Sequence, residues 1–141
     1  MTYLIRREIM TDKQAVENIV VAISKSFSGA ESTKNWTEKT IWFDAAPYAC
    51  VGAEKASKVF DEAFGNLKSC DVEILDIRTN INGTSALVCS VQKWDTVNKD
   101  GTANPPFMMR QTDYLEKING EWKVLHEHTS AAADWDGKIV E

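Results

Sequence analysis

Residues 109–130 read MRQTDYLEKI, then Asn119-Gly120, then EWKVLHEHTS. An Asn-Gly pair between two runs of alternating character is the strongest short-range signal of a β-hairpin. Both histidines of the chain, His126 and His128, lie in the second run, and residues two apart in a strand share a face. The segment therefore predicts two antiparallel strands with two distinct faces.

The chain before this hairpin begins with helical patterns. Thr11 and Gln14 form a capping box, which marks a helix start. Apolar residues then recur every three or four positions, so one face of the helix lies against a core: Val16, Ile19, Val20, Ile23 and Phe27. Gly29 is expected to end this helix. Two shorter helices are predicted at 33–39 and 53–65.

Strand patterns dominate the rest of the chain. A brief strand is predicted at 41–44, and two longer strands at 70–79 and 85–96, joined by a turn at Asn82-Gly83. Helices first and strands afterwards are typical of the α+β class, in which helices pack on one face of a curved antiparallel sheet.

Length and composition indicate a single globular domain. The chain has 141 residues, 43% of them hydrophobic and 26% charged, which is enough to bury a sizeable core. Arg6 and Arg7 are not followed by the apolar stretch of a signal peptide. We therefore expect 1–10 to be a leader or edge segment and 11–141 to be the domain.

Charge and cysteine content argue against several classes of partner. The net charge is −5 and no run of Lys or Arg is present, so attraction to nucleic acid is not expected. No apolar run approaches the ~18 residues of a membrane helix. Cys50, Cys70 and Cys89 are odd in number and lack a C-x-x-C spacing, which predicts reduced thiols in a cytoplasmic protein. No nucleotide-binding or nucleophile motif is present, and no cofactor is expected.

The order of elements and the ending Gly120–Ser130, GEWKVLHEHTS, resemble the nuclear transport factor 2-like superfamily. Within it the chain is most similar to the SnoaL-like branch and to the association domain of calcium/calmodulin-dependent kinase II. Arg110-Gln-Thr112 also resembles the SnoaL-like pattern, and the resemblance spans about 11–131. It implies a cone, in which a curved sheet wraps around a pocket capped by N-terminal helices, usually as a homodimer.

The resemblance to ketosteroid isomerases implies two candidate catalytic residues, Asp44 and Asp113. Asp44 matches their general base, and Asp113 matches a second aspartate that is held protonated and donates to an oxyanion. The physical need is general, since an apolar pocket penalises a charged carboxyl and raises its pKa. The match fails in the first helix, which lacks the tyrosine that supplies the other donor. The plainer interpretation is that Asp44 ends a strand and Asp113 is solvated or paired.

The resemblance also implies which hairpin face lines the pocket. Positions matching Asp113 and Thr129 line it in those families, which places on the same face Gln111, Leu125 and Glu127. An apolar wall is expected from Trp42, Phe60 and Phe64. Hydropathy alone favours the opposite face, with Tyr114, Trp122 and Val124 inward. Following the resemblance, we assign that aromatic face to a dimer contact, where Trp and Tyr are commonly enriched.

The register of the hairpin has two solutions. A bulge with Gly120 left-handed places Asp113 opposite Leu125, whereas a two-residue type I′ turn places it opposite His126. Both remain open from the sequence.

The two histidines alone are too few ligands for a metal site. His126 and His128 have no third ligand at a suitable spacing, so no metal is expected. As hydrogen-bonded residues of a sheet face, they would make dimerisation sensitive to pH, because their ordinary pKa is near ~6.5.

Two functions follow from these observations. One is binding of a small apolar or carbonyl-containing molecule in an internal pocket, with proton transfer next to a carbonyl as in isomerases or cyclases. The other is a non-catalytic dimerisation or association module. A cone packed solid by its aromatic residues favours the module, and a cavity of ~300 Å³ or more with Asp44 and Asp113 at its wall favours the ligand. The fold hosts both, so fold alone does not choose.

Overall fold

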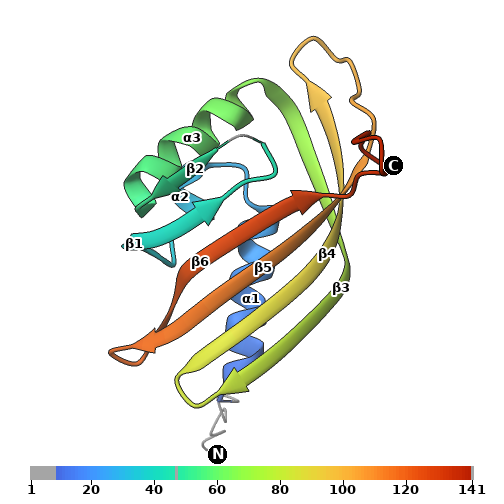
Figure 1. The fold of residues 1–141 in the computed structure, drawn as a ribbon. Helices are drawn as coiled ribbons and strands as arrows, with labels where there is room; N and C mark the ends of the chain where they lie inside the picture. Colours follow the sequence, from blue (N-terminus) through green and yellow to red (C-terminus); the bar gives the residue numbers. More distant parts are fainter. Residues whose placement is uncertain (1–8, 47, 141) are drawn as a thin grey trace, which may run out of the picture.

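The computed structural model describes residues 9–46 and 48–140, so most of the leader predicted at 1–10 lies outside the described residues. The helices are α1 (Asp12–Lys25), α2 (Gly29–Ser32) and α3 (Ala53–Gly65). The strands are β1 (Trp36–Phe43), β2 (Ala49–Val51), β3 (Leu67–Asn82), β4 (Ser85–Asn98), β5 (Phe107–Ile118) and β6 (Glu121–Ala131). Figure 1 shows the long strands as a twisted, curved sheet, with α1 crossing one face and α3 beside β1 and β2.

The six strands form one sheet in the order β2-β1-β6-β5-β4-β3. The predicted α+β cone, with helices on one face of a curved sheet, is confirmed. The sheet is not purely antiparallel, because β1 runs parallel to β6. No hairpin joins these two strands, and a pair connected through the rest of the chain is free to run parallel.

The helix α1 starts where the capping box predicts. Thr11 Oγ1 accepts from the Gln14 backbone N–H at 3.2 Å, and Gln14 Oε1 accepts from the Thr11 N–H at 3.0 Å. The first turn is fixed to the last hairpin, since Asp12 Oδ1 accepts from Lys117 Nζ and Trp122 Nε1, both at 2.9 Å. The helix ends at Lys25, before the predicted end at Gly29. The backbone becomes extended at Ser26.

The segment after α1 differs from the prediction. Residues 33–39 do not form a helix; the helical turn is α2, and β1 begins at Trp36. Ser28 caps α2, and the Gly29 N–H donates to Asp61 Oδ1 of α3 at 2.7 Å. The observed helix α2 therefore lies N-terminal to the helix predicted at 33–39. The helix predicted at 53–65 is confirmed as α3.

The β5–β6 hairpin contains both a tight turn and a bulge. Asn119 and Gly120 have φ of 52° and 81°, and Ile118 pairs with Glu121, as in a two-residue type I′ turn. The register then shifts between Tyr114 and Leu115, which leaves Leu125 without a cross-strand partner.

This bulge determines which residues face the helices. It places Asp113 opposite Glu127, so neither register considered from the sequence is correct at that position. A bulge inserts one residue and restores the other side-chain alternation beyond it. Trp122 and Val124 before the bulge and Glu127 and Thr129 after it are all buried. The assignment of Trp122 and Val124 to an outward dimer face is therefore wrong.

The hydrophobic core lies between the helices and the concave face of the sheet. Its buried members on α1 are Val16, Val20 and Ile23, which contact Trp36, Trp42 and other sheet residues. All three cysteines are free thiols. Within residues 9–46 and 48–140, no helix has the length and apolar character to cross a membrane.

Contact between α2 and α3 can be tested at Gly29. A Cβ built there would overlap the backbone oxygen of Ser57, whereas Gly65 at the end of α3 has open space. We expect Gly29→Ala to lower the free energy of unfolding by on the order of 1–3 kcal/mol, because a packed interface tolerates added volume poorly. Gly65→Ala is the matched control and should change it by less than about 1 kcal/mol, in the stabilising direction. Urea unfolding measures both; equal effects would contradict the packing described here.

Candidate functional site

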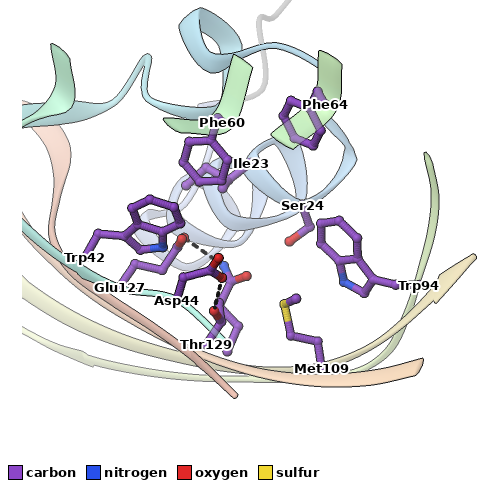
Figure 2. A pocket seen from close by; sticks show the side chains of 11 residues that line it. Ile23, Ser24, Trp42, Asp44, Phe60, Phe64, Trp94, Met109, Glu127 and Thr129 are labelled. Atoms are coloured by element: carbon purple, nitrogen blue, oxygen red, sulfur yellow. Dashed lines mark hydrogen bonds between the residues drawn. The ribbon is translucent and has the colours of Figure 1, made fainter. Parts of the chain in front are cut away.

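A small cavity lies between α1, α3 and the concave face of the sheet (Figure 2). Its apolar wall consists of Ile23, Trp42, Phe60, Phe64, Trp94 and Met109, and its polar part of Ser24, Asp44, Gln111, Glu127 and Thr129. The volume open to the centre of a water-sized sphere is about 40 Å³. That is room for a few water molecules, well below the ~300 Å³ typical of a ligand pocket. Asp44 lies at the wall and Asp113 does not, so the size and lining set out above as favouring a ligand are not met by the cavity as it stands.

Aromatic side chains occupy most of the cone. Trp42 and Phe60 stack with ring centroids 4.5 Å apart, and Phe60 stacks on Phe64 at 5.9 Å. All three residues predicted for the apolar wall line the cavity. Trp42 is only 2% exposed, while Phe60 and Phe64 are half-buried. The α3 side of the wall is thus the part nearest to solvent.

Asp44 lies at the polar part of the cavity, directly after β1. Its Oδ1 accepts from Thr129 Oγ1 at 2.9 Å and from the Ala45 backbone N–H at 2.8 Å. The side chain is half-buried. A carboxylate held through one oxygen in this way keeps its second oxygen available to a bound molecule.

Asp113 and Glu127 form a buried pair across β5 and β6. Asp113 has no exposed surface and Glu127 is 2% exposed. Gln111 Nε2 donates to Asp113 Oδ2 at 2.8 Å and to Glu127 Oε1 at 3.0 Å, so one amide bridges both carboxyls. Glu127 lines the cavity, but Asp113 does not.

Burial perturbs the acidity of this pair. It raises the pKa of Asp113 to about 6, against the lowering effect of hydrogen bonds from Glu127 and Gln111. It also raises the pKa of Glu127 well above its ordinary range, and the negative charge of Asp113 adds to this effect. Glu127 is therefore the protonated member of the pair. Asp113 Oδ1 has no hydrogen-bond partner in the described part of the chain.

Further polar residues extend this network, and the sequence analysis missed them. Gln111 Oε1 accepts from Gln92 Nε2 at 3.1 Å, and Gln92 Oε1 accepts from Trp94 Nε1 at 2.9 Å. Gln92 also lies 2.9 Å from Ser24 Oγ of α1. The available signal was alternation in β4, where Ser90, Gln92 and Trp94 share the face of buried Val88.

Leu125 does not join the site. It lies at the β6 bulge, is half-buried, and is absent from the cavity wall. The prediction that it lines the pocket assumed strict alternation along β6, which the bulge interrupts.

The histidines lie on the opposite, convex face. His126 Nδ1 is 2.9 Å from the Ile41 carbonyl oxygen, and the Phe43 ring meets the rings of both His126 and His128 edge-on, at 5.4 and 5.6 Å. In the described part of the chain, no group of three His, Cys, Asp or Glu side chains is arranged to hold a metal.

Comparison with known families now identifies the domain. The model of the SnoaL-like domain matches residues 13–134. The chain belongs to the SnoaL-like family. A search of curated proteins finds no significant match to this SnoaL-like domain.

Solved structures share the fold at low sequence identity. A nuclear transport factor 2-like protein of unknown function from Pseudomonas putida has 17% identity and a TM-score of 0.77, covering 94% of this chain and 96% of that chain. A nuclear transport factor 2-like superfamily protein from Salmonella enterica has 17% identity and a TM-score of 0.75, covering 87% and 92%. A ketosteroid isomerase-like protein from Erwinia carotovora has 18% identity and a TM-score of 0.71, covering 85% and 95%.

The buried pair predicts a specific pH dependence of stability. The pKa values of Asp113 and Glu127 are raised above their ordinary values of 3.8 and 4.5. The free energy that the pair contributes to the stability of the fold is therefore complete below pH 4, where the carboxyls are protonated in both the folded and the unfolded chain. It is lost as the pH rises through 6 and above, because the unfolded chain releases protons that the folded pair holds.

Glu127→Gln should remove much of this loss, since the amide is neutral without a titrating proton. We expect the variant to be more stable than the wild type at pH 7–8 by on the order of 1–3 kcal/mol, and the difference to shrink towards pH 4. Glu73→Gln, at an exposed position of β3, is the control. Urea unfolding between pH 4 and 8 decides; parallel curves for wild type and Glu127→Gln would show that the pair does not hold an extra proton.

Proposed function

We propose that this SnoaL-like domain binds a small, largely apolar carbonyl compound in the cavity and transfers a proton next to the carbonyl. The observation that carries the proposal is the pair of buried carboxyls, Asp113 and Glu127, beside a third carboxyl, Asp44, in an aromatic enclosure. Burial of carboxyls is costly to a fold. Perturbed acids gathered in a hollow are typical of functional sites.

The proposed roles differ between the three acids. Asp44 is the base, because it is the least buried of them and is held by two donors on one oxygen. Glu127 is the neutral donor, because it lines the cavity and its pKa is raised well above the ordinary range. The resemblance to ketosteroid isomerases assigned that role to Asp113, which does not reach the cavity.

Even a ligand of a single ring is larger than the cavity. Its volume of about 40 Å³ must increase on binding. Phe60 and Phe64 are half-buried, as is Trp94 on β4, and the two phenylalanines both lie on α3. Rotation of these two rings would enlarge the cavity without disturbing the hydrogen bonds at its polar part. Phe60 and Phe64 are thus proposed ligand-binding residues, together with Trp42, Gln111 and Thr129.

Cyclohex-3-enone is a suitable test substrate, since its isomerisation to the conjugated enone moves one proton next to a carbonyl and is followed by absorbance. We expect Asp44→Asn to reduce the catalysed rate by at least about 10²-fold, the usual contribution of a general base. Asp71→Asn, at an exposed position of β3, is the control and should retain the wild-type rate. Full activity of Asp44→Asn would reject Asp44 as the base, and a wild-type rate equal to that in buffer would reject isomerisation of this ketone.

A second candidate function is association through the convex face, as a homodimer. The exposed side chains Ile41, Phe43, Leu87 and Tyr114 favour it. Cross-strand pairing aligns Ile41 with His126, Tyr114 and Leu87 in one row, and Phe43 with His128 in the next. Such an apolar and aromatic strip is typical of interaction surfaces.

Sedimentation velocity tests this candidate. A homodimer through the convex face should dissociate in Tyr114→Glu and remain intact in Leu75→Glu, an exposed apolar position on β3. A wild-type protein that sediments as a monomer at every concentration would eliminate the association function.

A further inference from the structure

Trp42 carries a hydrogen-bond donor that the protein itself leaves unused. Its side chain is 2% exposed and lines the cavity, yet its Nε1 has no hydrogen-bond partner in the described part of the chain. Buried polar groups are nearly always paired, and leaving one unpaired carries a free-energy penalty of about 1–3 kcal/mol. An unpaired donor at a cavity wall points to an acceptor supplied from outside the chain.

Trp36 shows that an unpaired indole alone does not make a site. Trp36 Nε1 is also buried without a partner, but Trp36 does not line the cavity. Its ring lies edge-on to Trp42 and Phe60, at 6.1 and 5.9 Å, within the aromatic core. Trp42 differs because its nitrogen lies towards the polar part of the cavity, on the side of Glu127 and Asp44 (Figure 2).

The neighbours of Trp42 in the sheet place this donor beside the proposed acids. Trp42 pairs with Glu127 across β1 and β6, and Glu127 pairs with Asp113 across β5 and β6. Asp44 follows Trp42 by two residues and lines the same cavity. The donor, the neutral acid and the base thus surround one polar corner of an otherwise aromatic hollow.

We propose that the Trp42 indole N–H donates a hydrogen bond to the carbonyl oxygen of the bound molecule. This inference rests on the proposed function and names a further residue for it. Glu127 Oε1 accepts from Gln111 and Asp44 Oδ1 from Thr129 and Ala45, and neither carboxyl accepts from Trp42 Nε1. The ligand oxygen therefore supplies the missing acceptor.

The geometry gives each group one task in the reaction. Asp44 removes a proton from the carbon next to the carbonyl; the electron pair of that C–H bond forms a carbon–carbon double bond, and the carbonyl π electrons move to oxygen. Trp42 Nε1–H and the neutral Glu127 donate to this oxygen as its negative charge develops. Asp44 then returns the proton to a different carbon of the same ring system, so no oxidant or further reactant is needed.

Two probes of similar shape separate hydrogen bonding from simple occupancy. Cyclohexanone carries the acceptor oxygen, and methylenecyclohexane replaces it with CH₂. Entry of either probe is read from the Met109 methyl resonance, since Met109 lines the cavity. In protein with ¹⁵N-labelled indoles, we expect the Trp42 Nε1–H resonance to move downfield with cyclohexanone and not with methylenecyclohexane. The Trp36 resonance is the internal control and should not move with either.

Replacement of Trp42 by benzothienylalanine tests the same bond by affinity, because sulfur takes the place of N–H and the ring shape is kept. We expect cyclohexanone to bind about 3- to 10-fold more weakly, the loss of one neutral hydrogen bond, and methylenecyclohexane to bind unchanged. Equal weakening of both probes would overturn the role of Trp42.

The two proposals fail in different ways. Cyclohexanone could shift the Met109 methyl resonance while the Trp42 Nε1–H resonance is the same with both probes. The role of Trp42 is then overturned and ligand binding stands. If neither probe shifts Met109, even at millimolar concentration, ligand binding in the cavity is overturned as well.

Discussion

One unpaired residue in β6 determines which side chains of this SnoaL-like domain face the helices. The bulge at Leu125 follows a tight Asn119-Gly120 turn and reverses the side-chain alternation half-way along the strand. Before it, Trp122 faces inward and completes the core; after it, Glu127 faces inward opposite Asp113. A regular strand would place one of these two side chains in solvent. The bulge allows a single strand to supply both a hydrophobic core and an acidic site.

The acidic pair is held in the fold by a retained proton and by hydrogen bonds from a neutral side chain. Two charged carboxylates at neighbouring positions in a dry interior would repel each other strongly, so the pair retains a proton. Gln111 then bridges both groups, and Gln92 fixes Gln111 in turn. A satisfied polar network in a core is rigid and holds its members in one arrangement. The same arrangement keeps Glu127 neutral at the cavity wall.

The aromatic residues above this network both stabilise the fold and define the site. Trp42, Phe60 and Phe64 stack in series between β1 and α3, where large aromatic surfaces contribute much of the burial. The resulting cavity is small, so the proposed binding requires movement of the half-buried rings on α3. The apolar strip on the convex face is separate from this cavity, so the two proposed functions, binding and association, involve opposite faces of one sheet.

The sequence by itself determined the elements whose signals are local. The capping box at Thr11, the limits of α3 and the Asn119-Gly120 turn depend on residues a few positions apart. The family resemblance predicted four polar residues that line the cavity: Asp44, Gln111, Glu127 and Thr129. Only the tertiary structure decided the rest. The bulge at Leu125, the shift of α2 onto α3, and the partners of Gln92 and Trp42 arise from contacts between distant segments. Such contacts depend on which groups can be buried together, and no spacing along the chain encodes that.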